Sequence, residues 1–110
     1  MKYTNEQRIE KIKITVEKLM DYIEENKLTR EDVANDETIR WTVTTPLYNI
    51  GEHVYNLTID FKNEHNEIPW TKISGLRHRL VHDYDDTNWD IVNDIIFTII
   101  PEFKKQLDEL

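Results

Sequence analysis

The sequence predicts an all-α protein, an up-and-down bundle of four to five helices that forms a single domain over residues 1–110. The chain has only 2 Gly and 3 Pro, and its apolar residues recur at steps of three and four along most of its length. No stretch shows sustained alternation of apolar and polar residues, and no hairpin-type turn dipeptide appears. With 110 residues, the chain is long enough for one core and too short for a second.

The first helix is predicted from a capping box, in which Thr4 is followed by Gln7. It should run for about six turns. Its apolar stripe comprises Ile9, Ile12, Val16, Leu19 and Ile23. Thr29 with Asp32 has the spacing of a second cap, over a short turn.

Asn35-Asp36 then caps a helix whose apolar spacing continues to Phe61. Pro46 lies inside this run and removes one backbone hydrogen bond, so it should bend the helix unless the run is two helices; we expect a bend and no domain boundary. The polar segment 63–67 ends the pattern. The apolar residues of this run are Ile39, Val43, Leu47, Ile50, Val54, Leu57 and Phe61.

Pro69 occupies the expected first position of a further helix, which should continue to about His82. Residues 83–88 form an acidic loop, and Thr87 or Asn88 caps a last helix that Pro101 bends in its middle. The predicted core residues of these two helices are Trp70, Ile73, Leu76, Leu80, Val92, Ile95, Ile96, Ile99, Phe103 and Leu107.

Composition excludes several classes of protein. The absence of Cys rules out disulfides, thiolate zinc sites and thiol nucleophiles, and it fits a reducing cytosol. The longest strongly apolar run, 95–100, is far shorter than a membrane helix, so we expect a cytoplasmic protein that does not contact a membrane. A net charge of −8 disfavours coating of long DNA, although salt screening allows a locally basic patch to hold a short nucleic acid.

One segment departs from this acidic background. Residues 68–82 contain no Asp or Glu, yet they include Lys72, Arg77, His78, Arg79 and His82. They form the best candidate for an anion-binding patch. The alternative is a solvated helix face without a function.

Arg77, His82 and Tyr84 are spaced as Arg-x4-His-x-Tyr. This spacing resembles the motif of the HEPN superfamily, specifically the HepT-like toxin family. The Ile-Gly-Glu segment at 50–52, the Ile-Pro-Trp segment at 68–70 and the segment 73–77 are also similar to that family. Downstream, Trp89-Asp90-Ile91-Val92 and Pro101 match its last helix. The resemblance covers about residues 37–110, and the first helix fits only generically.

The resemblance implies a HEPN-like fold and a metal-independent endoribonuclease that needs no cofactor. It implies a homodimer that brings Arg77 and His82 of both chains to one cleft, where RNA such as tRNA or mRNA is cleaved. It also implies a type VII-like toxin–antitoxin pair. The partner would be a minimal nucleotidyltransferase antitoxin that silences the toxin by transferring AMP groups to Tyr84.

These residue types suit the chemistry. Cleavage at a ribose 2′-hydroxyl needs a base, an acid for the leaving oxygen and a fixed cation beside the phosphorus. Imidazole can serve as acid or base, and guanidinium can fork onto two phosphate oxygens. Positions 77 and 82 lie about 140° apart around a regular helix. They therefore converge only through a frayed helix end or across a dimer, and a dimer also supplies a second His82.

Other residues are assigned supporting roles, each with an alternative. Lys72, His78 and Arg79 are candidates for phosphate binding. Glu52 either orients the motif Arg or His from the neighbouring helix or is a solvated carboxylate. Tyr84 is either the modified residue or a side chain that packs on the end of the bundle.

His78 stands where the family often has Asn, and its i, i+4 spacing to His82 is also that of two metal-binding imidazoles. Asp83, Asp85 or Asp86 could add a carboxylate. Arg79 opposes a cation there, so we predict no metal site.

The remaining His and Trp residues are expected to have structural roles. His53 and His65 should lie on the surface. Trp41, Trp70 and Trp89 should be core or dimer-contact residues. The main alternative function is a non-catalytic HEPN domain that binds a nucleotidyltransferase partner or a nucleotide. A plain helical dimerisation module is a third possibility, which leaves the acid-free segment without a reason.

Overall fold

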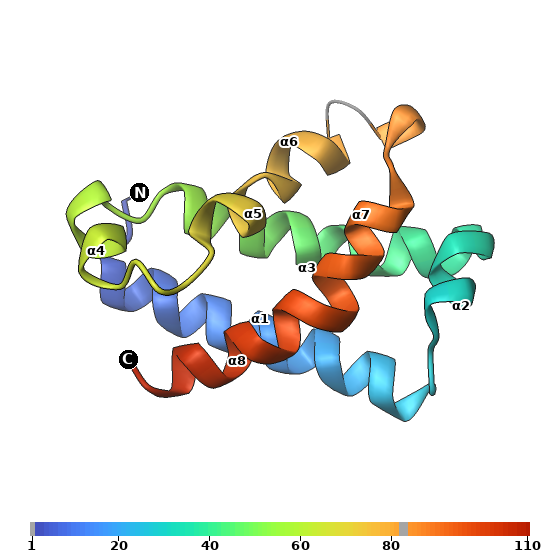
Figure 1. The fold of residues 1–110 in the computed structure, drawn as a ribbon, viewed down its shortest axis with the longest axis horizontal. Helices are drawn as coiled ribbons and strands as arrows, with labels where there is room; N and C mark the ends of the chain where they lie inside the picture. The colour runs from blue at the N-terminus through green and yellow to red at the C-terminus, as the bar shows by residue number, and fades with distance from the viewer. Residues whose placement is uncertain (1, 82–83) are drawn as a thin grey trace.

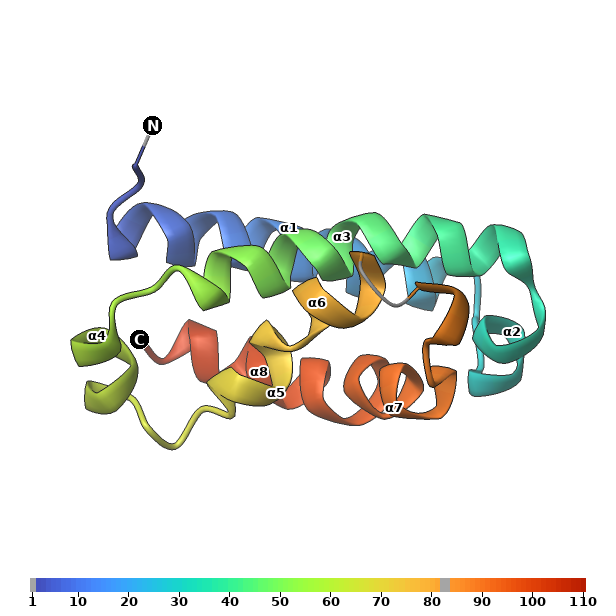
Figure 2. The ribbon, with the colours of Figure 1, turned by 90° about the horizontal axis from the view of Figure 1, so that it is seen from above.

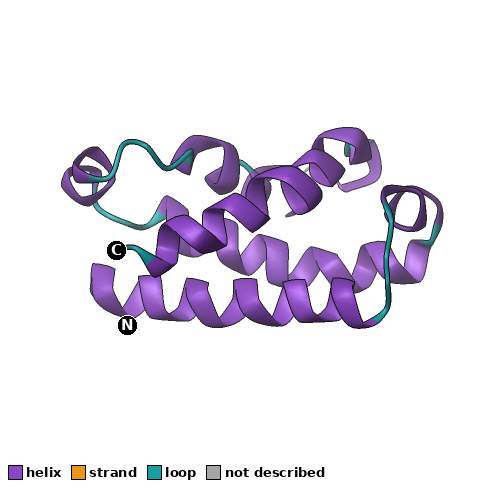
Figure 3. Cartoon of the chain, turned by 60° about the horizontal axis from the view of Figure 1, so that its bottom comes forward, coloured by secondary structure: helices purple, strands orange, loops and turns teal. Residues whose placement is uncertain are grey.

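A computed structural model of the chain describes residues 2–81 and 84–110, with the backbone alone at 81 and 84. The described residues form helices joined by short connections and contain no strand (Figure 3). The predicted all-α, HEPN-like fold is confirmed. The elements are α1 (Asn5–Glu25), α2 (Arg30–Asn35), α3 (Glu37–Tyr55), α4 (Ile59–Glu64), α5 (Trp70–Ser74), α6 (Leu76–Val81), a 3₁₀ turn (Tyr84–Asp86), α7 (Trp89–Asp94), a π-helical turn (Ile95–Ile99) and α8 (Ile100–Asp108).

Four rods alternate in direction (Figure 1). They are α1, α3, the α5–α6 pair and the α7–α8 pair. The packed pairs include α1 with α3, α3 with both α5 and α6, and α1 with α8. Helix α4 and both termini lie at one end of the molecule, and α2 lies at the other end (Figure 2). None of the described helices has the length and hydropathy needed to span a membrane.

The helix starts follow the predicted caps. Thr4 Oγ1 accepts a hydrogen bond from the Gln7 backbone N–H at 3.1 Å, and Gln7 Oε1 accepts from the Thr4 N–H at 2.8 Å. The same reciprocal pair joins Thr29 and Asp32 at the start of α2. Asp36 caps α3, and Asn88, of the two candidates, caps α7. These side chains satisfy backbone donors that have no partner within the helix.

The core contains all the predicted apolar residues except Ile23, Ile39, Phe61 and Ile99, which are partly buried and pack against it. The side chains of α5 and α6 attach these short helices to α3, because Ile73 and Leu76 are fully buried. Phe103 of α8 lies edge-on to the Trp70 ring, with 5.9 Å between centroids.

The predicted boundaries were wrong at two places. Helix α3 ends at Tyr55 and does not reach Phe61, because Thr58 caps a separate helix, α4. Leu57 is buried in the intervening turn, so the apolar spacing continues although the helix does not. The predicted helix from Pro69 to His82 is divided at Gly75, and Pro69 precedes its first turn. Ser74 Oγ donates to the Thr71 carbonyl, a side-chain bond that competes with regular helix pairing.

The two prolines inside helices are accommodated differently. Helix α3 continues through Pro46. In the last rod, the wider π-helical turn Ile95–Ile99 ends two residues before Pro101. Proline has no N–H and its ring crowds the carbonyl four residues earlier, and a wider turn relieves that crowding.

Candidate functional site

The candidate site lies where α6 crosses α3. Arg77 on α6 donates a hydrogen bond from Nε to Oε2 of Glu52 on α3, at 2.7 Å. The guanidinium carbon lies 4.2 Å from the centre of the Tyr55 ring, a cation–π contact. Asn56 Nδ2 donates to the other carboxylate oxygen of Glu52, at 3.3 Å. Arg77 is therefore held on two sides by side chains of one neighbouring helix.

These contacts fix the charges of the pair. The hydrogen bond from Arg77 lowers the pKa of Glu52, partial burial of the carboxyl opposes this, and hydrogen bonds from Asn56 and Tyr48 assist it. The bond to Glu52 in turn raises the pKa of Arg77. At neutral pH, the carboxylate is ionised and the guanidinium is charged, so Glu52 both positions Arg77 and neutralises part of its field.

Gly51 explains how α6 comes so close to α3. A Cβ atom at this position would lie 2.9 Å from the backbone nitrogen of Arg77 and 3.1 Å from the carbonyl oxygen of Ile73. Both atoms belong to main chain, which cannot rotate away as a side chain could. The Gly51-Glu52 pair therefore combines the residue that allows the approach with the residue that holds Arg77.

The other described site residues predicted from the sequence lie on α5 and α6. His78 is exposed and Arg79 half-buried, both on α6, so they share a short helix with Arg77. Lys72 is exposed on α5 and lines a separate cleft. The Glu52–Arg77 contact thus agrees with one of the two interpretations of Glu52, the one in which it orients the motif arginine.

His82 lies outside the described residues, and the side chain of Tyr84 does as well. The backbone of Tyr84 begins the 3₁₀ turn. Just beyond this turn, Thr87 Oγ1 donates to the carbonyl oxygen of Arg79 at 2.9 Å. This bond links the two ends of the segment that carries both motif residues.

Sequence reasoning missed two aromatic residues of the site, Tyr48 and Tyr55. Tyr55 contacts Arg77 through its ring, and Tyr48 helps to lower the pKa of Glu52. The signal was available in the sequence, because positions 48, 52 and 55 share one helix face by the i, i+4, i+7 rule.

The two histidines that the sequence places on the surface, His53 and His65, are both partly buried. His53 is partly buried and not on the open surface, because Arg8 Nη1 lies 3.1 Å from its Nδ1 and Tyr3 packs edge-on against its ring. Burial lowers the pKa of His53, and the positive charges of Arg8 and Lys11 lower it further. The described residues contain no group of three His, Cys, Asp or Glu side chains arranged to hold a metal ion.

Comparison with known proteins identifies the family. Residues 6–110 match the family described as "Ribonuclease HepT-like". The chain belongs to this family. Among HepT-like relatives, "Putative RNase TTE0752" of Caldanaerobacter subterraneus subsp. tengcongensis is 36% identical over 80 residues, which are 73% of this chain and 71% of the relative.

Two archaeal proteins are also similar to this HepT-like chain. "Putative RNase MJ0127" of Methanocaldococcus jannaschii is 32% identical over 96 residues, 86% of this chain and 79% of the relative. "Probable ribonuclease HepT" of Thermococcus cleftensis is 28% identical over 110 residues, 100% of this chain and 98% of the relative. No solved structure gives a significant match.

Proposed function

We propose that this HepT-like chain is a metal-independent endoribonuclease that cleaves RNA in the cleft of a homodimer, with Arg77 and His82 as catalytic residues. Membership of the family and the ribonuclease names of its relatives support the reaction class. The observation that carries the residue assignment is the clamping of Arg77 by Glu52 and Tyr55, five positions before His82.

The clamp leaves part of the guanidinium available to a substrate. Glu52 accepts from Nε–H, and the side chain of Arg77 retains 32% exposure. Arginine has further N–H donors on its two terminal nitrogens, which can fork onto two phosphate oxygens. Arg77 would bind the scissile phosphate and stabilise charge as it develops there, while His82 would transfer the protons.

A face of α3 supports the homodimer. Trp41, Tyr48 and Tyr55 recur every seven residues, and Glu52 lies on the same face. Trp41 is 58% exposed and Tyr55 is 54% exposed, an unusual state for large aromatic side chains. A second copy packed on this face would bury both and place two Arg77–Glu52 pairs near the twofold axis, where one His82 could act as base and the other as acid.

The same proposal includes regulation. The chain would be the toxin of a pair whose antitoxin, a minimal nucleotidyltransferase, transfers AMP groups to Tyr84. Each AMP adds negative charge and bulk close to Arg77 in sequence, and it would exclude RNA by repulsion and occlusion. We expect Tyr84→Phe to resist modification by the partner with labelled ATP, whereas Tyr3→Phe should be modified like the wild type.

The decisive experiment measures cleavage of labelled RNA by wild-type protein, His82→Ala and Arg77→Gln, with Lys18→Gln at an exposed position of α1 as a control. Loss of the acid–base group should lower the rate by about 10²–10⁴-fold, and a chelator should leave the wild-type rate unchanged. Activity that survives in His82→Ala would overturn the assignment. A wild-type protein that never cleaves RNA, yet binds the nucleotidyltransferase, would instead support the non-catalytic HEPN alternative.

A further inference from the structure

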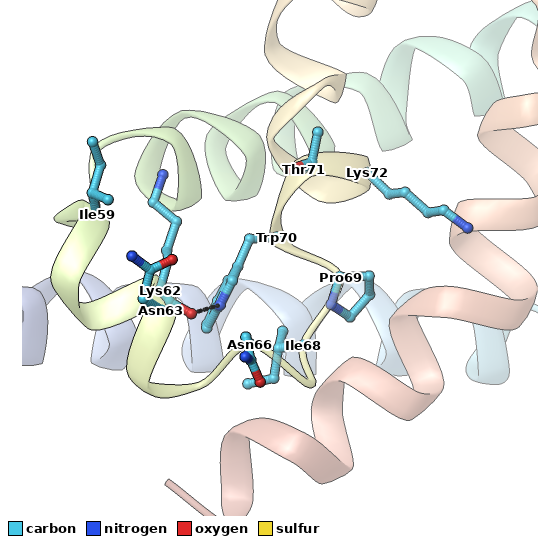
Figure 4. A pocket seen from close by; sticks show the side chains of 9 residues that line it. All are labelled: Ile59, Lys62, Asn63, Asn66, Ile68, Pro69, Trp70, Thr71 and Lys72. Carbon is cyan, nitrogen blue, oxygen red and sulfur yellow. Dashed lines mark hydrogen bonds between the residues drawn. The ribbon is translucent and has the colours of Figure 1, made fainter.

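A cleft elsewhere on the molecule, apart from the Arg77–Glu52 pair, is lined by positively charged side chains. Helices α4 and α5 and the loop between them border an open cleft of about 480 Å³ (Figure 4). Of the described residues that line this α4–α5 cleft, two are lysines, Lys62 and Lys72, and none carries a carboxylate. The chain as a whole has 22 acidic residues against 14 Lys and Arg, so the charged residues that line the cleft are opposite in sign to the net charge of the chain.

The floor of the cleft is rigidly built. Trp70 is 6% exposed, and its indole N–H donates to the carbonyl oxygens of Lys62 at 3.3 Å and His65 at 3.0 Å. Its ring also packs on Phe103 of the core. Because Trp70 ties the end of α4 to the start of α5, the two walls that bear the lysines have fixed positions before any ligand arrives.

The walls combine charged, polar and apolar groups. Figure 4 shows Lys62 and Lys72 on either side of Trp70, with the Lys72 side chain extending away from Trp70 at the edge of the cleft. Asn63 and Asn66 add amide groups, which can both donate and accept hydrogen bonds, and Pro69 adds an apolar surface. Ammonium groups for phosphates, amides for base edges and a flat apolar surface for a base are what an unpaired nucleotide requires.

Tyr55 connects this cleft to the candidate active site. Its backbone carbonyl accepts a hydrogen bond from Lys62 Nζ at 3.3 Å, and its ring lies against the guanidinium of Arg77. Tyr55 therefore contacts both Lys62 of the cleft and Arg77, the residue that would hold the scissile phosphate. Partial burial lowers the pKa of Lys62, and no carboxylate within the described residues forms an ion pair with it.

We propose that the α4–α5 cleft is a binding site for single-stranded RNA, in which Lys62 and Lys72 contact phosphates beside the one held by Arg77. This inference rests on the proposed function and extends it to substrate binding. An acidic peptide could also pair with two lysines, but the amides, the apolar floor and the link to Arg77 through Tyr55 favour a nucleotide chain.

The test uses a fluorescent 2′-O-methyl RNA of about twelve nucleotides, which the enzyme cannot cleave at a 2′-hydroxyl, and measures binding by anisotropy. Lys62→Gln and Lys72→Gln should each weaken binding by about 3–10-fold. The double variant should reduce the slope of log K against log salt by about 1.4, the value for two phosphate contacts on a single strand. Lys18→Gln on α1 removes the same charge elsewhere and should bind like the wild type. Lys62→Arg keeps the charge and should restore binding.

Cleavage measurements separate binding from chemistry. For an unmodified RNA, the double variant should raise KM about tenfold or more and leave kcat within about twofold. Unchanged binding and salt slope in the double variant, with active wild-type enzyme, would overturn the cleft proposal alone. Wild-type protein that neither binds nor cleaves RNA would overturn both proposals. Tighter binding of a deca-glutamate peptide than of RNA, lost in the double variant, would assign the cleft to an acidic protein segment and refute the RNA site.

Discussion

Replacing Gly51 by Ala tests whether the close approach of α3 and α6 sets the position of Arg77. The added Cβ would lie 2.9 Å from the backbone nitrogen of Arg77 and 3.2 Å from Cβ of Leu76. Real Cβ atoms do not approach backbone that closely, so α6 must move away from α3. Because Glu52 is the next residue on α3, the movement also lengthens the Arg77–Glu52 contact.

The magnitude follows from two opposing effects. Alanine is favoured over glycine within a helix by about 1 kcal/mol. Inserting a methyl group into a filled space costs typically about 1–3 kcal/mol. The net loss for Gly51→Ala is therefore about 1 kcal/mol, which corresponds to roughly 4 °C in Tm for a domain of this size.

Gly75→Ala provides the matched control. Its added Cβ would lie 3.4 Å from the nearest atom, the carbonyl oxygen of Thr71, which is an ordinary contact. Gly75 has φ −60° and ψ −21°, values that alanine adopts freely. The control should gain about 0.4–1 kcal/mol from reduced freedom of the unfolded chain.

Urea and thermal denaturation followed by circular dichroism should therefore separate the two glycine variants by about 1.4–2 kcal/mol, the sum of the loss and the gain. RNA cleavage should fall in Gly51→Ala and persist in Gly75→Ala. If Gly51→Ala proves as stable as Gly75→Ala, the backbone contact does not limit the approach of the helices and the reasoning is wrong.

Two further predictions concern stability. The pKa of Glu52 is lower in the folded chain than its ordinary value of 4.5, so its ionisation stabilises the fold above that pH and the contribution is lost as the pH falls through the folded pKa. The destabilisation caused by Glu52→Gln, measured by urea unfolding, should therefore be larger at about pH 6 than at about pH 3, and a constant difference would contradict the assignment. Phe103→Ala should cost about 3–5 kcal/mol, because the ring is fully buried against Trp70; a loss under about 1 kcal/mol in the same assay would show that the floor of the cleft does not depend on it.

The sequence predicts those parts of this fold that depend on neighbouring residues. Thr4 with Gln7 and Thr29 with Asp32 form the caps that their spacing indicates, because a cap is completed within one turn. The apolar stripes predict the core because residues three and four positions apart lie on the same face of a helix. Asp36 likewise begins α3 where the sequence places it.

The expectations that fail depend on distant contacts. The stripe from Ile39 to Phe61 suggests one helix, yet the Asn5 side chain donates to the Thr58 hydroxyl and accepts from the Thr58 backbone N–H, which helps to hold the turn before α4. Since the sequence predicts no separate α4, it gives no reason to place Lys62 beside Lys72. The Glu52–Arg77 contact was expected only through the resemblance to a family, because 25 positions separate the two residues and local periodicity does not relate them.

The hydrogen bond from Thr87 to the Arg79 carbonyl has a consequence for how silencing could work. It joins α6 to the residue just beyond the 3₁₀ turn, so one hydroxyl helps to hold together the two described flanks of the motif segment. Under the proposed silencing, an AMP group on Tyr84 would be attached to a backbone turn that this bond ties to α6.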